Sequence, residues 1–561
     1  MTTRKVIGTR GVKMEKHSKD KKPTIHEKKT SLDSIKELMK KSPSRAKAEL
    51  MRHLEKYPED MYGWHFYGKL AADISDFEEA EYAFTKVAES KSWNKYAGVV
   101  GLGDVARKRG ERELAKKYYR QAINENPNEK SHTFCALARM ECLDENYEEA
   151  IKVLEMANIQ DNEIMISKMQ TYVLKGDKEA ALAIAESIIP TKDEERMTIA
   201  FEKAKLALLE DKKEEAKQLL ALAKSYQVKG KGYYGILNTE ALLALEENNL
   251  DLAERNCQEC LADKVTVNGD IYITLGRVKQ LKGEYKESIE NFELATKQIN
   301  VSRITKQAGL LYGALIEMAL GNEEKATQMF EESLTITKEP YTPIIENLCG
   351  IYCKNGQYDK MREVVSKCRP IAKHVSLVSS LNFVEIVLKV KLGEELPPIT
   401  KCNYRERQVI NYNKEAAIEH IKTQHLEGST PKNTPNDFPE AEDISRGTFA
   451  SSINIEELYD EVLPQLTEET KVRTGLVDRY VIDYPNAGYT GNGEIVNFVR
   501  VVTLPNTYDI ISMFPATEAF TIRKCDVRDY LEKEEQKKKT NSRVAKFNNR
   551  FANYTSKNGN K

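Results

Sequence analysis

The chain has 561 residues, of which 31% are charged and 40% are hydrophobic, and its formal net charge is −1. A single core rarely grows beyond about 250–300 residues, so the length argues against one globular domain. No apolar run approaches the roughly 18 residues of a membrane span, and the basic N-terminus has no apolar segment after it. We therefore expect a soluble, cytoplasmic protein.

The charge is spread unevenly along the chain. Residues 1–30 hold ten Lys and Arg against three Asp and Glu, and residues 536–561 hold eight against none. The stretch between them has 68 basic and 84 acidic residues. Such basic ends with few apolar residues are typical of flexible tails. We expect residues 1–30 to form a disordered basic arm, which either only solubilises the protein or attracts nucleic acid, a ribosome or a membrane surface.

A unit of 31 to 38 residues recurs after this arm. Each unit has a small or compact residue midway along its expected second helix, and most have a larger apolar residue four positions later, such as Tyr119 after Ala115. Offsets of four place both side chains on one helix face. A glycine such as Gly110 often lies five positions earlier, where it can end the first helix. The aligned positions are Ala46, Ala80, Ala115, Ala150, Ala181, Ala216, Ala253, Ser288, Ala326 and Met361.

These helical hairpins resemble the tetratricopeptide repeat (TPR) family over roughly residues 31–392. The units at 96–129 and 269–302 carry the resemblance best, the latter through Leu275, Gly276, Gly283, Tyr285, Phe292 and Ala295. The resemblance implies an all-α solenoid, a right-handed superhelix of about nine to ten hairpins stacked side by side. An unrelated helical-hairpin solenoid is the alternative.

We expect the repeat array to cover residues 31–396, with a helix at 376–392 capping its open end. The pair Pro397-Pro398 then ends the helical pattern. Residues 397–452 are expected to be a connector, with a helix at 413–425 and a flexible linker.

A small C-terminal α+β domain is expected at residues 453–532. It starts with a short helix at 453–466, and β-branched and aromatic residues then predict strands at 479–484, 494–504 and 508–513. Turn residues separate these strands, including the segment from Pro485 to Gly488.

Residues 533–561 are expected to form a basic tail. Val544, Phe547 and Phe551 would share one helix face. The tail is interpreted as a docking helix or an RNA-contacting segment, or as a helix that packs on the rest of the chain. Its basic residues are Lys537, Lys538, Lys539, Arg543, Lys546 and Arg550.

The residues that could form metal or catalytic motifs are better explained by structural roles. Cys257 and Cys260 have metal-ligand spacing, but no second ligand pair follows, and both fall at core offsets of a repeat. The glycines from Gly488 to Gly493 precede a strand pattern, whereas phosphate loops precede a helix. The sequence therefore predicts no metal, no cofactor and no catalytic residues, although an active site assembled from distant residues stays open.

The resemblance also implies a partner-binding groove lined by the first helix of each hairpin. Apolar residues late in the array, from Leu311 to Met318, either continue this groove or pack against the next unit. The groove residues expected from the family offsets are Tyr62, His65, Lys69, Asp104, Arg107, His132, Arg139, Asp270, Arg277, Leu311, Leu315 and Met318.

From these features we expect a non-enzymatic scaffold or adaptor that binds protein or peptide partners in the groove. Two alternatives remain. The protein could associate with nucleic acid or ribosomes through its basic tails, which would make binding strongly dependent on salt. It could also be a peptide-sensing signalling regulator, in which a bound peptide changes the placement of the C-terminal domain.

Overall fold

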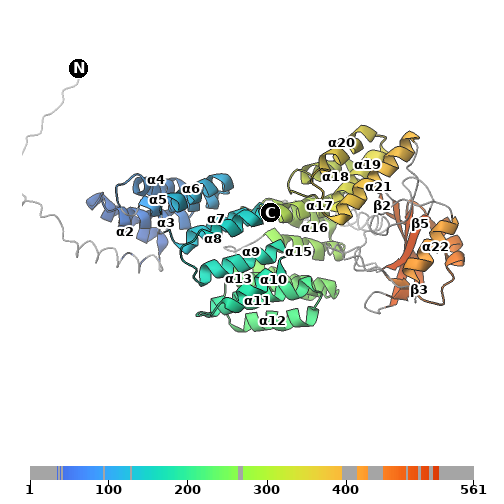
Figure 1. Ribbon diagram of the computed structural model, residues 1–561, viewed down its shortest axis with the longest axis horizontal. Coiled ribbons are helices and arrows are strands. Elements are labelled where there is room, and N and C mark those ends of the chain that lie inside the picture. The colour runs from blue at the N-terminus through green and yellow to red at the C-terminus, as the bar shows by residue number, and fades with distance from the viewer. Residues whose placement is uncertain are drawn as a thin grey trace, which may run out of the picture. The chain divides into compact units, whose positions relative to one another are not determined.

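The computed structural model contains two compact units, residues 1–137 and residues 138–561 (Figure 1). Each unit is described by itself. The residues that the structure describes are 35, 38, 42–92, 95–126, 129–262, 269–394, 414–426, 447–474, 478–489, 495–503 and 510–516. The predicted basic arm and basic tail lie outside these residues.

Consecutive helices form the first unit. Pro43 occupies the first turn of α2, as its position before a helical pattern suggests, and Asp60 caps α3 by accepting a hydrogen bond from the Gly63 amide. The helices are α2 (Pro43–Lys56), α3 (Met61–Asp73), α4 (Phe77–Ala88), α5 (Lys95–Arg109) and α6 (Arg112–Glu125), followed by α7 (Ser131–Leu143), which runs into the second unit.

The second unit continues the hairpins as far as a last long helix. That helix, α21 (Val375–Leu392), matches the expected capping helix at 376–392. Before it come α8 (Tyr147–Glu155), α9 (Asn162–Lys175), α10 (Lys178–Ser187), α11 (Asp193–Leu209), α12 (Lys213–Ser225), α13 (Lys231–Glu246), α14 (Leu250–Ala262), α15 (Gly269–Leu281), α16 (Tyr285–Thr296), α17 (Arg303–Ala319), α18 (Glu323–Ser333), α19 (Thr342–Lys354) and α20 (Tyr358–Cys368).

The structure confirms the predicted repeat register. All ten aligned positions, from Ala46 to Met361, are 0% exposed. Within a hairpin, an aromatic ring of the second helix fills the space beside a glycine of the first, and a Cβ added to Gly276 would lie 2.5 Å from the ring of Phe292. The same arrangement joins Gly68 to Phe84 and Gly103 to Tyr119. The glycines of the first helix therefore leave room for the aromatic rings of the second helix.

The turn inside each hairpin also repeats. The Glu111 amide donates to the Ala106 carbonyl at 2.9 Å across Gly110, which has φ 83°, so the last turn of α5 ends in a left-handed residue. Equivalent left-handed residues are Ser75, Glu145, Gly176, Asp211, Asn248, Gly283, Gly321 and Gly356. Four of these are not glycine, which explains why glycine alone marked only part of the repeat.

In the second unit, hydrogen bonds join the α7–α8 turn to segments far away in the sequence. Nε of Arg303, at the start of α17, donates to the Asp144 carboxylate in the α7–α8 turn at 3.3 Å. The Lys338 ammonium donates to the Glu145 carbonyl in the same turn at 3.0 Å. This turn is thus tied to segments 159 and 193 residues later in the chain.

An antiparallel sheet with the strand order β1-β3-β4-β5 lies at the C-terminal end, and β2 also pairs with β3. The Gly447 amide donates to the Pro515 carbonyl at 2.8 Å, which joins the β1 side to β5, so the sheet curls back on itself. The strands are β1 (Thr448–Phe449), β2 (Lys471–Thr474), β3 (Asp478–Tyr489), β4 (Ile495–Thr503) and β5 (Ile510–Ala516).

The sheet differs from its prediction in two respects. Strands β1 and β2 were not predicted because they contain two and four residues. The segment from Pro485 to Gly488 is not a turn between strands: β3 continues through it, with a register shift between Asp483 and Gly488 and a left-handed Asn486. Gly488 is required there, since an added Cβ would lie 2.1 Å from the Thr448 carbonyl oxygen.

Two helices cover the sheet and share its apolar core. Helix α23 (Ile455–Val462) continues into a short 3₁₀ turn (Leu463–Gln465), which matches the predicted helix at 453–466. Helix α22 (Lys414–His425) packs Ala417, Ile418 and Ile421 into the same core, so the domain includes a segment that the sequence had assigned to the connector. Figure 1 shows α22 beside the strands.

Candidate functional site

Charged side chains of the first unit act together on one histidine, and they come from the first helices of two neighbouring hairpins and from the connector after the second. His65 and Lys69 lie on α3, Asp104 lies on α5, and Lys130 follows α6. Burial lowers the pKa of His65 to about 4, and the ammonium groups of Lys69 and Lys130 lower it further, while Asp104 opposes them. All three charges therefore act on one imidazole, and His65 is neutral at neutral pH.

Asp104 is held in place by its neighbours. The Tyr119 hydroxyl donates to Oδ1 of Asp104 at 2.8 Å, and Nη2 of Arg107 donates to the same oxygen at 3.3 Å. Nε of Arg107 also donates to the Tyr119 hydroxyl at 3.3 Å. Burial, with the nearby Asp104 carboxylate, raises the pKa of Tyr119, so this hydroxyl stays protonated and can donate.

We call His65, Lys69, Asp104, Arg107 and Lys130 the N-terminal polar cluster. Three of these residues are basic, one is acidic, and His65 is neutral, so the cluster carries a net positive charge. Lys69 and Lys130 are exposed. Tyr62 extends this surface: its side chain is 41% exposed and its ring lies 4.7 Å from that of Phe66. Surfaces of this kind attract anionic side chains.

The remaining polar residues expected in the groove lie outside the N-terminal polar cluster. His132 and Arg139 are exposed on α7. The Thr305 hydroxyl donates to the Asp270 carboxylate, which links α17 to α15. The Arg277 guanidinium lies over the ring of Tyr312, 5.5 Å from its centroid.

The apolar residues late in the array pack against the next hairpin. Leu311 is 2% exposed and belongs to the core formed with α19, α20 and α21. Leu315 and Met318 are half-buried against the same core. Their side chains therefore contribute to the contact between hairpins in this conformation.

Comparison with known proteins identifies the repeat. A tetratricopeptide repeat family model matches residues 99–129, the hairpin formed by α5 and α6. The α5–α6 hairpin matches a tetratricopeptide repeat. This agrees with the ten buried repeat positions. The sequence matches no curated protein.

Three solved structures are similar to the chain at low identity. A tetratricopeptide repeat protein from Parabacteroides merdae is 14% identical, with 45% of this chain and 97% of that one covered and a TM-score of 0.35. Yeast Tom70 is 12% identical, with 65% and 88% covered and a TM-score of 0.35. The Cut9–Hcn1 hetero-tetramer of APC/C is 11% identical, with 64% and 84% covered and a TM-score of 0.36.

The sequence did not indicate two residues of this region: Lys130, which belongs to the N-terminal polar cluster, and Tyr119, which holds Asp104. Lys130 lies in the connector between hairpins, whereas the family offsets are confined to the first helix of each TPR unit. Tyr119 is at an apolar core offset and is 0% exposed, yet its hydroxyl reaches Asp104. A tyrosine where other units carry Phe or Leu is the signal that could have identified it.

The cysteine pair of α14 has a packing role. Cys257 and Cys260 are both 0% exposed, and burial raises the pKa of the Cys257 thiol to about 12. Among the residues that the structure describes, no group of three His, Cys, Asp or Glu side chains is placed to hold a metal ion. None of the described helices is both long and apolar enough to cross a membrane.

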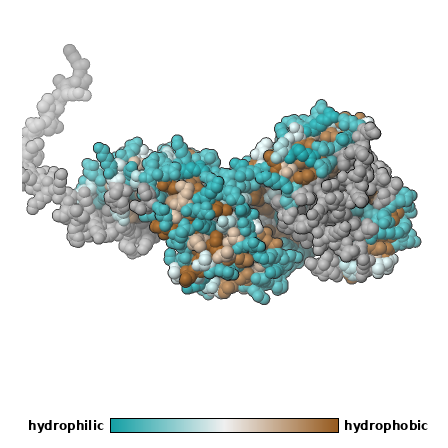
Figure 2. Space-filling model, viewed as in Figure 1, coloured by the Kyte–Doolittle hydropathy of each residue, from teal (hydrophilic) through white to brown (hydrophobic). Residues whose placement is uncertain are grey.

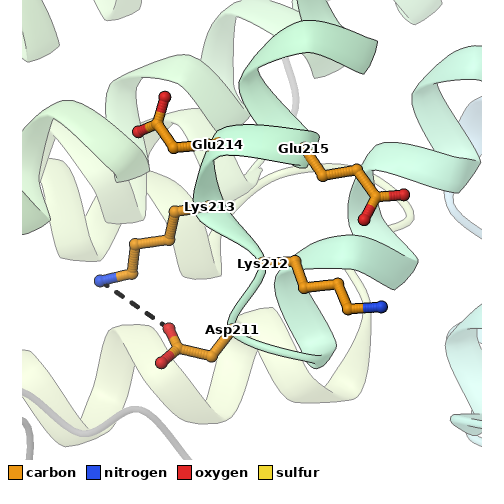
Figure 3. Close-up of a pocket in the computed structure, with 5 residues that line it drawn as sticks. All are labelled: Asp211, Lys212, Lys213, Glu214 and Glu215. Atoms are coloured by element: carbon orange, nitrogen blue, oxygen red, sulfur yellow. Dashed lines mark ion pairs between the residues drawn. The ribbon is translucent and has the colours of Figure 1, made fainter.

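The surface of the array also contains an open hollow at the α11–α12 turn. It is lined by five consecutive charged residues, Asp211 to Glu215, whose side chains point in different directions (Figure 3). Nζ of Lys213 lies 4.0 Å from Oδ1 of Asp211. These groups do not converge on a common point, so they form a solvated turn. On the face shown in Figure 2, most of the described surface is hydrophilic, with separate hydrophobic islands.

Proposed function

We propose that the protein is a non-catalytic scaffold whose TPR inner face binds a segment of a partner protein. The observation that carries this proposal is the N-terminal polar cluster, because charges from α3, α5 and the connector after α6 all act on the His65 imidazole. Packing with Tyr119 and Phe84 holds Asp104 and His65 in position, so these residues lose little freedom on binding.

The charge of the cluster favours an acidic partner segment. Lys69 and Lys130 are exposed, and both ammonium groups act on the His65 imidazole, so they can pair with carboxylates beside it. Tyr62 adds an aromatic contact at the edge of this surface.

The experiment is a selection of peptides from a displayed random library on the full chain. Peptide affinities are then measured by fluorescence anisotropy for the wild type, Lys69→Glu and Lys130→Glu. Lys117→Glu, on an exposed position of α6, is the matched control because it makes the same charge change on the second helix of a hairpin.

We expect selected peptides to be acidic and to bind each cluster variant about tenfold more weakly, a loss of about 1.4 kcal/mol, with Lys117→Glu unchanged. Equal affinity for all three variants would contradict the proposal.

We also propose that this scaffold works in the cytoplasm. The proposed attraction of the basic segments 1–30 and 533–561 for nucleic acid or ribosomes stays a prediction from the sequence, because both segments lie outside the described residues.

A further inference from the structure

The sheet domain contacts the last hairpin of the array, and both lie within the second unit. Nη2 of Arg479, at the start of β3, lies 3.7 Å from Oε2 of Glu346 on α19. Their side chains are only 19% and 15% exposed. The Ser380 hydroxyl on α21 donates to Oε1 of Glu346 at 2.7 Å. The Glu346 carboxylate is therefore held by the array on one side and by the sheet domain on the other.

Cys353 marks the same face of α19 two helical turns later. It is 4% exposed. Burial raises the pKa of the Cys353 thiol, and the two charges that act on it come from Lys391 of α21, which lowers it, and Asp478 of β3, which raises it. Asp478 is 0% exposed and pairs with Lys471 of β2 at 3.1 Å. The β2–β3 end of the sheet thus lies beside Cys353 as well as Glu346.

The repeat register gives both array residues the offsets of the proposed inner face. Glu346 lies 15 positions before Met361, as His65 lies 15 before Ala80, and Cys353 lies eight before Met361, as Arg107 lies eight before Ala115. In the first hairpins these offsets belong to the N-terminal polar cluster. In the last hairpin, the same surface faces strands β2 and β3.

The contact is polar, whereas each side has its own apolar core. Among the described residues, the core of α19, α20 and α21 shares no member with the core of the sheet domain. Contacts of this kind within a chain resemble transient protein interfaces and open more readily than a continuous apolar core.

We propose that the sheet domain is an intramolecular occupant of the inner face of the last TPR hairpin, held there by Arg479 on Glu346. In this closed arrangement the domain covers Glu346 and the side of Cys353 that faces Asp478, while the rest of Cys353 packs in the core of α19, α20 and α21. Release of the ion pair exposes Glu346 and that side of the thiol. The proposal rests on the proposed function only in treating the inner face as a binding surface, and its test requires no partner.

The first readout is the rate of iodoacetamide alkylation of Cys353 in the full chain, measured by mass spectrometry. Cys349, one helical turn earlier on α19 and 0% exposed, is the internal control. Arg479→Glu should raise the Cys353 rate at least about tenfold while Cys349 stays slow, because the thiol becomes accessible and leaves the Asp478 carboxylate. The swap Glu346→Arg with Arg479→Glu should restore the slow rate.

Arg362→Glu is the matched control. Arg362 on α20 pairs with Glu394 at 3.2 Å at the same end of the array, and both side chains are about half exposed, at 54% and 49%. This variant should leave the Cys353 rate unchanged. An unchanged rate in Arg479→Glu, or equal acceleration of Cys349, which would indicate unfolding of the hairpin itself, would overturn the proposal.

The second readout is the distance distribution between spin labels attached through non-natural amino acids at Ser366 on α20 and Gln465 in the sheet domain. Both positions are exposed. We expect one narrow distribution for the wild type and the charge swap, and a broad, longer one for Arg479→Glu. A broad distribution in the wild type would show that the domain does not dock and would overturn the proposal, whatever the fate of peptide binding.

Discussion

At the residue scale, each of three hairpins depends on a glycine that leaves room for an aromatic ring. Gly276 is the tightest of the three pairs, and Phe292 beside it is 0% exposed. Small residues at nine of the ten aligned positions serve the same close approach of helices, and Met361 occupies the tenth. These positions could be predicted from the sequence because they recur at a steady spacing. The role of the Tyr119 hydroxyl could not, because it depends on a neighbour 15 residues away.

Replacing Gly276 by Ala should lower the free energy of unfolding by about 1–3 kcal/mol, because the added Cβ would lie 2.5 Å from the Phe292 ring in a packed core. Urea unfolding of the full chain measures this. The double variant with Phe292→Leu should show less than the sum of the two single effects, since the smaller side chain gives the methyl group room. Strict additivity would count against this packing.

His65 should make stability depend on pH. Its pKa in the folded state is about 4, below the ordinary value of 6.5, so the unfolded state binds its proton more readily. The contribution of neutral His65 is present above pH 6.5 and is lost as the pH falls toward 4. Between pH 7 and pH 4.5 the wild type should lose about 2 kcal/mol more than His65→Asn. Equal losses in urea unfolding would show that the imidazole is not buried against these charges.

At the scale of elements, the hairpin turn is the most regular feature of the array. Asp211 occupies the left-handed position with φ 57° and its side chain is 88% exposed. Asp211→Gly should therefore stabilise the protein by about 0.5–1 kcal/mol, because glycine adopts this conformation without steric cost. The opposite change at an equivalent turn, Gly176→Ala, should destabilise it by a similar amount. Thermal unfolding of both variants tests this prediction. Shifts of the two melting temperatures in the same direction would contradict it.

The contact between Arg303 and Asp144 joins elements that local periodicity cannot relate. Asp144 is only 4% exposed, so removing its basic neighbour should be costly. Arg303→Ala should lower the free energy of unfolding by about 1–3 kcal/mol. Lys297→Ala, which removes an ion pair with 69% and 41% exposed side chains, should change it by less than about 0.5 kcal/mol. Similar effects of the two variants on urea unfolding would contradict a structural role for this contact.

At the scale of the whole molecule, the order of array and sheet domain could be predicted, and so could α21, α22 and the three longer strands. The composition changes at each of these points. The inclusion of α22 in the sheet core could not be predicted, because its three buried apolar residues suit any partner surface. The division near Leu137 was also hidden, since the TPR pattern continues through α7 without interruption.

The inner face of the first TPR hairpins is the central element of this account. Hydrogen–deuterium exchange of the full chain, with and without a saturating peptide from the library selection, tests it most directly. We predict slower exchange in peptides that cover α3, α5 and the connector around Lys130, with α4 and α6 unchanged. Slower exchange confined to α4 and α6, or to residues outside the array, would contradict it.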